Sequence, residues 1–407
     1  MKQGWEIKRL GEVAEILNGG TPKTNIAEYW DGDIYWITPA DLGKLRKPKV
    51  DDTPRKITRL GLEKSSAKLF PENSVILSTR APIGHLAINE VPMSTNQGCR
   101  GIVPCKKLDN WFLYYFLKKN VELLDSLGAG ATFKELSTKA LAGVEIPLPP
   151  LPEQQRIVSI LDEAFAAIAK AKANAEQNLK NGKELFESYL QGVFENGNWE
   201  TKTIQEITKI VNGYAFASKD FKPTNTIKSV KITNVGVKEF VEEADNYLPE
   251  KFKETLKDFQ VREGNIVIAL TRTIISAGLK VAVVPASYDG ALVNQRVAAL
   301  VPNEKLANQN FLYYFLTTSG VAKYVLAHVN TLMQPNLSIN DLKNLPVPCP
   351  SIKEQQTVVR QLDALRAESQ KLEAVYQKKI DDLEELKKSI LQKAFAGELK
   401  SEKAVVV

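Results

Sequence analysis

The chain has 407 residues, of which 43% are hydrophobic and 25% charged; this composition is typical of a globular protein and predicts two to three domains. Its net charge of +6 is mildly basic and by itself only weakly favours a nucleic-acid partner. Three cysteines outside CxxC spacing argue against a zinc site or disulfide framework, and the lack of a leader or long apolar run predicts a cytoplasmic protein without a membrane span.

The first predicted element, residues 5–19, has a counterpart at residues 199–213. Both segments begin with Trp-Glu and end with Asn-Gly, a pair that is typical of the turn after a helix. We therefore expect two copies of one unit, each starting with a short helix closed by Asn-Gly. The copies match least at residues 23–70 and 217–262, where loops on a shared frame would vary.

Residues 44–68 carry nine basic side chains against three acidic ones. The segment is either a solvated surface loop or a patch that faces phosphates, since neutralising phosphates is the main source of DNA affinity. The basic residues are Lys44, Arg46, Lys47, Lys49, Arg55, Lys56, Arg59, Lys64 and Lys68.

Apolar, β-branched runs at residues 75–80 and 267–272, each ending in a polar Thr-Arg, predict a strand in each copy. An arginine ends each run, and an Asn-Gln pair follows further along. The arginines are candidate base readers or loop anchors, and the amides either pin a loop or contact DNA. These residues are Arg80, Asn96 and Gln97 in the first copy, and Arg272, Asn294 and Gln295 in the second.

The sextet Phe-Leu-Tyr-Tyr-Phe-Leu occurs identically at residues 112–117 and 311–316. Its aromatic residues are continuous with apolar neighbours, so we expect a buried helix in each copy rather than a surface on which bases stack.

Long helices are predicted after two proline-studded strips, and both open with Glu-Gln-Gln, at residues 153–155 and 354–356. Apolar residues then recur in steps of four and three, as in a coiled-coil seam, and the two seams match at an offset of 201 residues. One seam has small residues where the other has large ones, so we expect the helices to pair, antiparallel because the second must run back along the first. The alternative is two helices that each pack on their own domain. The seam includes Ile157, Leu161, Ala164 and Ala171 in the first helix, and Leu362, Leu365, Leu372 and Leu383 in the second.

The sequence lacks the motifs of a catalytic or metal site. It contains no HExxH, no GxxxxGK[ST] phosphate loop, no amino-methyltransferase motif and no convincing nuclease cluster of carboxylates and lysine. The two histidines, His85 and His328, stand at non-equivalent places. These observations favour a binding protein over an enzyme.

Two variable domains, each followed by a proline-rich strip, Glu-Gln-Gln and a long helix, resemble the specificity subunit of type I restriction–modification enzymes. The segment Ile390–Leu399 is also similar to the end of those subunits. The resemblance implies an α+β fold, in which two globular α/β target-recognition domains are held apart by two long antiparallel coiled-coil helices in a pseudo-twofold repeat. We expect the domains at residues 1–150 and 197–349, the helices at 151–196 and 350–400, and a tail at 401–407.

The resemblance also implies a non-catalytic DNA-recognition subunit. Each domain would read one half of a bipartite double-stranded DNA target, while the helices set the spacer and dock two modification subunits. Restriction subunits would join the assembly; the partners would hold S-adenosylmethionine, ATP and Mg²⁺, and this chain no cofactor and no metal. A homodimer is expected when the partners are absent. The alternative is a two-lobed adaptor that joins proteins and has no DNA specificity.

Within this interpretation, exposed basic residues are candidates for contacts to DNA phosphates. Phosphate contacts position a protein on DNA, whereas base contacts specify the sequence, so the specifying residues should lie mainly where the two copies differ. The candidates are Lys44, Arg46, Lys47 and Lys49 in the first domain, and Lys219, Lys222, Lys228 and Lys231 in the second.

Overall fold

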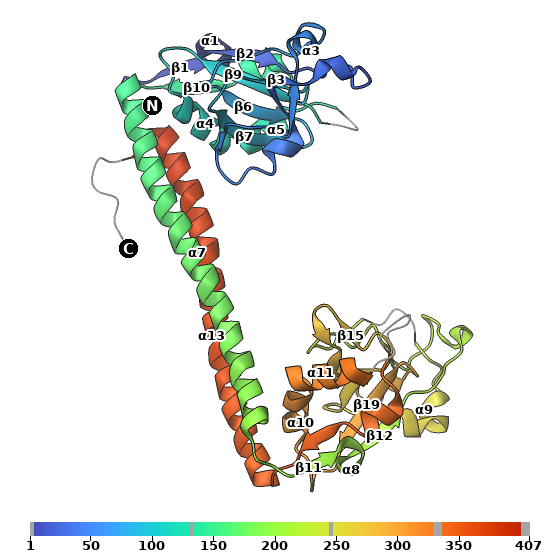
Figure 1. Cartoon of the computed structure of the whole chain (residues 1–407). Helices are drawn as coiled ribbons and strands as arrows, with labels where there is room; N and C mark the ends of the chain where they lie inside the picture. The colour runs from blue at the N-terminus through green and yellow to red at the C-terminus, as the bar shows by residue number, and fades with distance from the viewer. Residues whose placement is uncertain (1–3, 131–133, 244–246, 329–335, 400–407) are drawn as a thin grey trace. The chain divides into compact units, whose positions relative to one another are not determined.

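The computed structural model describes residues 4–130, 134–243, 247–328 and 336–399 (Figure 1). Its contacts divide the chain into two units, one of residues 1–176 with 378–407 and the other of residues 177–377. Each unit contains a globular domain and part of two long helices, α7 (Leu151–Asn196) and α13 (Ile352–Ala396). The expected tail, residues 401–407, lies outside the described residues. No helix in the described ranges has both the length and the hydropathy of a membrane span.

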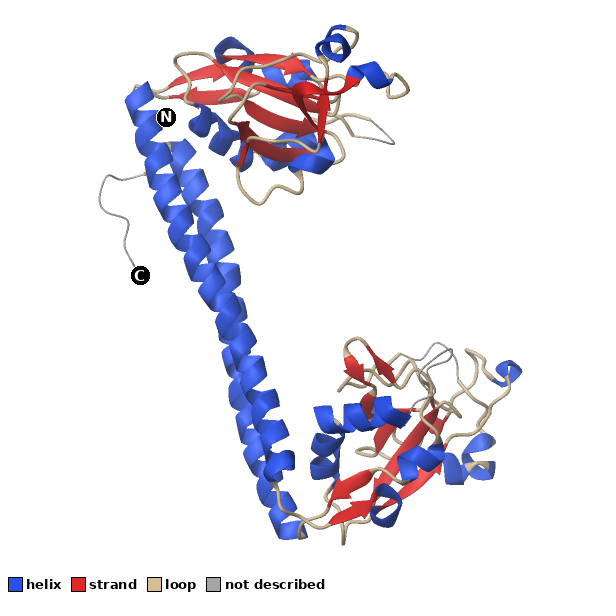
Figure 2. Cartoon of the chain, viewed as in Figure 1, coloured by secondary structure: helices blue, strands red, loops and turns tan. Residues whose placement is uncertain are grey.

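The first domain consists of short strands and helices (Figure 2). Its strands are β1 (Glu6–Arg9), β2 (Ala14–Asn18), β3 (Trp30–Ile37), β4 (Lys49–Val50), β5 (Arg55–Ile57), β6 (Val75–Thr79), β7 (Ile83–Asn89), β8 (Met93–Thr95), β9 (Cys99–Pro104) and β10 (Glu145–Leu148). Its helices are α1 (Leu10–Val13), α2 (Pro39–Leu42), α3 (Arg59–Glu63), α4 (Asn110–Lys119), α5 (Val121–Ser126) and α6 (Thr138–Ala142), with the 3-10 turn η1 (Ala27–Tyr29). The strands form a sheet of order β2-β9-β6-β7-β4, a second sheet of order β5-β3-β8 and the pair β1-β10.

The second domain repeats the central part of this sheet. Its strands are β11 (Thr201–Thr203), β12 (Thr208–Asn212), β13 (Ser229–Val230), β14 (Ile266–Ala269), β15 (Ile274–Ile275), β16 (Gly278–Leu279), β17 (Val281–Val283), β18 (Leu292–Val293), β19 (Val297–Pro302) and β20 (Pro346–Pro348). Its helices are α8 (Ile204–Ile207), α9 (Phe252–Thr255), α10 (Gln309–Leu316), α11 (Ser319–His328) and α12 (Ile339–Lys343), with the 3-10 turns η2 (Ser218–Asp220), η3 (Lys257–Phe259) and η4 (Ala286–Tyr288). The antiparallel order β12-β19-β14-β17 matches β2-β9-β6-β7.

Strand β6 is buried on both faces, which accounts for its continuous apolar run. Because successive side chains of a strand point to opposite faces, Val75 and Leu77 pack in the same core as Phe112 of α4, while Ile76 packs with Phe70. The predicted strands are therefore confirmed as β6 and β14, although they end at Thr79 and Ala269, before the arginines. The aromatic sextets form α4 and α10 and are largely buried, also as predicted.

Asn-Gly ends a strand in both copies, so the prediction that it closes a helix was wrong. Helix is confined to α1 and α8, and Asn18 and Asn212 are the last residues of β2 and β12. A Cβ on Gly19 would lie 1.8 Å from the carbonyl oxygen of Asn96, and the same holds for Gly213 at 2.0 Å from that of Asn294. Glycine is required here because two backbone segments approach closely.

The first glutamine of each Glu-Gln-Gln motif joins a long helix to the aromatic helix of its domain. Gln154 is fully buried; its Nε2 donates to the carbonyls of Lys107 and Pro149, and its Oε1 accepts from the backbone N–H of Asp109, the N-cap of α4. Gln355 repeats all three bonds in the second unit, on the N-cap of α10. The motif recurs because the same junction is built twice.

The long helices run antiparallel within each unit. In the first unit, Leu161 shares a core cluster with Leu391, and Lys172 binds Glu384. In the second unit, Leu190 packs with Leu362, and the Ser369 hydroxyl donates to the carbonyl of Gly182 at 3.0 Å. Residue numbers fall along α13 as they rise along α7, and the expected α+β fold with paired antiparallel helices is what the structure contains.

The seam departs from the expected spacing in its second half. Ile157 and Leu161 are buried, and Ala164, Ala171, Leu365 and Leu383 are half-buried, but Leu372 is 46% exposed. On α7, Leu185 is 60% exposed, while its neighbour Phe186 and the more distant Leu190 pack in the core cluster of the second unit. A straight helix of 3.6 residues per turn drifts by about 20° per heptad, which moves the contacts to adjacent positions over this length.

Candidate nucleic-acid interface

Two arginines of the first domain, Arg80 in the loop after β6 and Arg100 on β9, lie at one carboxylate. Arg80 Nη1 and Arg100 Nη2 lie 3.6 and 3.4 Å from the carboxylate oxygens of Glu135. Arg100 also donates to Thr138 Oγ1 and two backbone carbonyls at 2.8–3.1 Å, and only 10% of its side chain is exposed. Arg80, with 33% of its side chain exposed, is therefore the arginine of this pair that can reach a ligand at the surface.

The Asn-Gln pair of the first domain divides into an inner and an outer residue. Asn96 Oδ1 accepts a hydrogen bond from the backbone N–H of Gly98 at 2.9 Å, which holds the turn. Gln97 is exposed, and its Oε1 accepts from the hydroxyl of Thr21. The geometry gives Asn96 a structural contact and leaves Gln97 at the surface.

The second domain builds the corresponding loop with Arg272, whose backbone has φ +49°. The N–H of Arg272 donates to Asn336 Oδ1 at 3.4 Å. Asn336 stands where the first domain has Glu135, because each directly precedes a buried leucine and the serine that caps the next helix. A neutral amide thus replaces the carboxylate that binds Arg80.

The second Asn-Gln pair repeats the first in geometry. Asn294 Oδ1 accepts from the N–H of Arg296 at 3.3 Å, and Gln295 is exposed while its N–H donates to the carbonyl of Tyr214 at 3.0 Å. In both domains the asparagine holds the turn and the glutamine lies outside it.

Two charged positions in these loops were missed by the sequence analysis. The exposed Arg296 of the second domain aligns with Gly98 of the first, and the buried Arg100 of the first aligns with Ala298 of the second. The available signal was a mismatch inside an otherwise matched segment, directly after Asn-Gln. The two loop surfaces consequently carry different charges on the same backbone frame.

The predicted phosphate-contacting residues of the first domain lie in the segment between α2 and β4. Lys44, Arg46 and Lys47 are exposed and, among the described residues, make no hydrogen bond or ion pair through their side chains. Lys49 differs, because its Nζ lies 2.7 Å from the carboxylate of Glu90.

The predicted basic residues of the second domain fall into two pairs. Lys219 and Lys222 are exposed. Lys228 lies with its Nζ 4.5 Å from the ring centroid of Tyr288 and donates to a backbone carbonyl, and Lys231 Nζ lies 4.7 Å from the ring centroid of Phe221. The second pair braces the variable loops against aromatic rings, a favourable contact for a cation.

A basic and aromatic cluster in the first domain was also missed. The guanidinium of Arg55 lies 4.7 Å from the ring of Trp36 and 5.9 Å from that of Trp30, and the two rings meet edge to face at 5.1 Å. The spacing of the two tryptophans on one strand, beside the basic segment, is the signal that could have found it.

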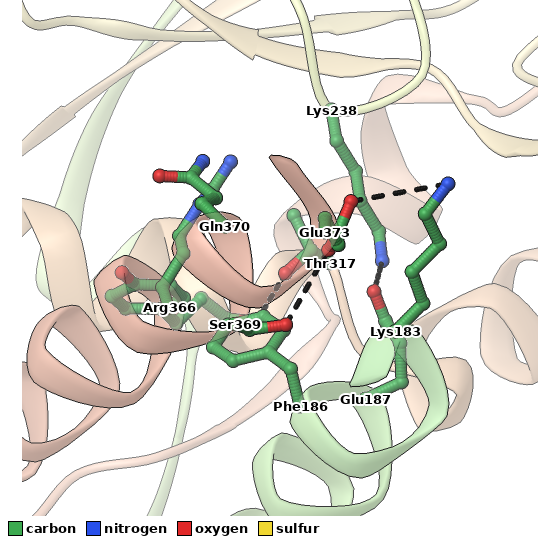
Figure 3. A pocket seen from close by; sticks show the side chains of 10 residues that line it. Lys183, Phe186, Glu187, Lys238, Thr317, Arg366, Ser369, Gln370 and Glu373 are labelled. Carbon is green, nitrogen blue, oxygen red and sulfur yellow. Dashed lines mark hydrogen bonds and ion pairs between the residues drawn. The ribbon is translucent and has the colours of Figure 1, made fainter. Parts of the chain in front are cut away.

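The second unit contains a cleft of about 290 Å³ between α7, α13 and the globular domain (Figure 3). Two of its cations are paired: Lys238 Nζ lies 2.5 Å from the carboxylate of Glu187, and Lys183 Nζ lies 3.8 Å from that of Glu373. Across the residues that the structure describes, no group of three or more histidine, cysteine or acidic side chains could hold a metal ion.

The family model of the type I restriction modification DNA specificity domain matches the chain at residues 2–180 and 196–382. The type I restriction enzyme MjaIX specificity subunit of Methanocaldococcus jannaschii is 29% identical over 426 residues, which cover 98% of this chain and 94% of that protein. The EcoKI specificity subunit of Escherichia coli is 25% identical over 444 residues, which cover 98% and 90%.

Solved structures share the fold over nearly the whole chain. One solved structure concerns complex assembly and conformational transition of a type I R-M system. A chain in it superposes with a TM-score of 0.77 at 18% identity, and the match covers 98% of this chain and 99% of that one. The HsdS subunit from Thermoanaerobacter tengcongensis has a TM-score of 0.61 at 19% identity and covers 98% of each chain.

Proposed function

The chain belongs to the family of type I restriction–modification DNA specificity subunits, and we propose that each globular domain reads one half of a bipartite DNA target. Its role is recognition of DNA, whereas catalysis in such systems is carried by partner subunits. Specificity subunits bind no cofactor themselves. The family supports this function over that of a protein-interaction adaptor without DNA specificity.

The proposal of two half-sites rests on one observation: equivalent loops of the two domains have the same backbone arrangement but different charged side chains. Arg80 and Arg272 lie in equivalent loops, but the first faces Glu135 where the second domain has Asn336. Arginine binds guanine through two hydrogen bonds in the major groove, so we propose these two as base-reading residues. Their different surroundings would give the two domains different preferences.

We propose that the exposed basic side chains contact phosphates. Lys44, Arg46 and Lys47 would do so in the first domain, and Lys219 and Lys222 in the second, since exposed cations without fixed partners are free to neutralise phosphates. The remaining candidates would contribute less, because their side chains already have intramolecular contacts; they are Lys49, Lys228 and Lys231.

We further propose that the long helices dock two modification subunits, which would hold S-adenosylmethionine and methylate adenine, and that restriction subunits with ATP and Mg²⁺ join this assembly. Exposed apolar side chains on the helices support docking, since such positions mark protein interfaces when they gather. They include Leu185 and Val375, each 60% exposed, and Leu372 at 46%. We place this role in the cytoplasm.

Exchange of residues 1–150 for the first domain of another family member tests the two-half-site proposal. Because the second domain is left intact, we expect one half-site of the methylated sequence to change and the other to stay. Sequencing of methylated DNA from cells that carry the chimera with both partner subunits measures this. The reciprocal exchange of residues 197–349 is the matched control, and a change in both half-sites from either single exchange would contradict the proposal.

A further inference from the structure

The ion pairs that join the long helices have the same polarity in both units. In the first unit, Lys172 Nζ lies 2.7 Å from the carboxylate of Glu384, and in the second, Lys183 Nζ lies 3.8 Å from that of Glu373. In each pair α7 supplies the lysine and α13 the glutamate. The internal repeat relates these residues to one another, because Glu373 follows Lys172, and Glu384 follows Lys183, by 201 residues. Each residue therefore has the opposite charge to its own repeat counterpart.

The leucine contacts between the long helices do not by themselves determine which helices pair. Leu161 shares a core with Leu391, and Leu190 with Leu362. The repeat offset of 201 residues relates Leu161 to Leu362 and Leu190 to Leu391. A pairing of α7 with α7 of a second copy, in the same geometry, would again place leucine against leucine, and so would a pairing of two α13 helices.

The charged side chains distinguish the pairing of α7 with α13 from the pairing of two like helices. Two α7 helices in this geometry would place Lys172 of each chain against Lys183 of the other. Two α13 helices would place Glu373 against Glu384 in the same way. Like charges held at these distances repel, whereas the unlike helices form two attractive contacts.

A second set of side chains has the same bias. Lys387 of α13 lies 5.4 Å from the ring of Phe165 on α7, and their repeat counterparts, Phe186 of α7 and Arg366 of α13, line one cleft in the second unit. In both places α7 supplies the aromatic ring and α13 the cation. Two α13 helices would bring Arg366 against Lys387.

We propose that these residues form a pairing code through which α7 accepts α13 and rejects a second α7. The interaction surface of each long helix thus fits the other half of the chain and not a like half. This inference does not depend on the DNA-reading role of the domains. It also restricts the homodimer expected from the sequence, which would have to form through unlike helices or through other surfaces.

The test exchanges one ion pair while keeping it attractive. In the variant Lys172→Glu with Glu384→Lys, the pair within the first unit survives with reversed polarity, and the second unit is untouched. A pairing of two α7 helices now brings the substituted position 172 against Lys183, which is attractive. An added Ala175→Cys, near the middle of α7, reports such a dimer because position 175 would lie close to itself across two α7 helices. Full-length chains are refolded at high concentration and oxidised, and the disulfide-linked dimer is quantified.

We expect about tenfold more linked dimer from the exchange variant than from the chain with Ala175→Cys alone. The matched control reverses all four charges, with Lys172→Glu, Lys183→Glu, Glu373→Lys and Glu384→Lys, and should stay as low as the unexchanged chain because the code is restored. Equal amounts of dimer in all three proteins would overturn the proposal. Should the first variant fail to fold by circular dichroism, Lys183→Glu with Glu373→Lys makes the same comparison in the second unit.

Discussion

Single residues explain why parts of the repeat persist. Gln154 and Gln355 are each 1% exposed or less and make the same three hydrogen bonds, whereas their neighbours Gln155 and Gln356 are exposed. A glutamine side chain ends in both a hydrogen-bond donor and an acceptor. The junction requires both, because it joins the long helix to carbonyls of the proline-rich segment and the domain and to a backbone N–H of the domain. The motif therefore preserves a joint in the fold and not a contact with DNA.

Replacement of this glutamine tests its structural role. We expect Gln154→Ala to lower the free energy of unfolding by about 2–3 kcal/mol, because it leaves a buried N–H and two carbonyls without their hydrogen-bond partner. Urea denaturation followed by circular dichroism measures the change. Gln155→Ala is the matched control and should shift the free energy by less than about 0.5 kcal/mol, since its side chain is exposed. Equal losses in the two variants would refute this account of the motif.

The sequence predicted residues of the shared frame better than those of the candidate site. Arg80 and Arg272 became candidates because they end matched runs of the two copies. The partner of Arg80, Glu135, could not be predicted, because 55 residues separate the two and only the fold brings them together. Side-chain contacts of this kind depend on loop conformation, and loops leave no periodic pattern in the sequence from which the contacts could be predicted.

At the scale of elements, each aromatic helix binds a long helix through a tyrosine. The Tyr115 hydroxyl donates to Asp162 in the first unit, and the Tyr314 hydroxyl donates to Asp363 at 2.6 Å in the second. Burial, followed by the hydrogen bond to Asp363, raises the pKa of Tyr314 to about 12, and burial with Asp162 raises that of Tyr115 as well. Each bond thus favours the protonated phenol in the folded state.

The pH dependence of stability tests this contact. Because the pKa of Tyr314 rises from 10.0 to about 12 on folding, its contribution is complete below pH 10 and is lost as pH increases toward 12. We expect Tyr314→Phe to be less stable than the unsubstituted protein at pH 9, with the difference shrinking up to pH 12. Urea unfolding at a series of pH values measures it. A difference for Tyr314→Phe that stays constant across this pH series would argue against the hydrogen bond.

The long helices and sheet strands were predictable because their patterns are local. On α7, the expected seam positions from Ile157 to Ala171 are buried or half-buried, and farther along the contact moves to an adjacent residue, from Leu185 to Phe186, because a 3.5-residue spacing cannot be distinguished from a 3.6-residue spacing over a few turns. The short strands β4, β5, β13 and β18 were not predicted. Each has two or three residues and is fixed by partners far away in the chain, so no pattern could mark it.

At the scale of the whole molecule, the two copies share the contacts that hold the fold together but differ in their charged residues. The equal parts are the glutamine junctions, the tyrosine–aspartate bonds and the central sheets. The unequal parts are the charged loop residues and the interhelical ion pairs, in which each position and its counterpart differ in sign. A protein that reads an asymmetric target needs both, because the frame must stay common while the contacts with each half-site diverge.

The length of α7 then becomes a functional quantity, and its shortening is a test at this scale. We expect removal of residues 174–180 together with residues 375–381 to shorten the spacer of the recognised sequence while leaving both half-sites unchanged. Seven residues correspond to about 10 Å along a helix and close to two full turns, so the rotation of the helix faces changes by only about 20°. At 3.4 Å per base pair, the spacer should lose up to about three base pairs. Sequencing of methylated DNA from cells with the complete modification complex reads spacer and half-sites together. Removal from α7 alone is the control, since it breaks the seam and should abolish methylation; altered half-sites with an unchanged spacer would show that the helices do not set the spacing.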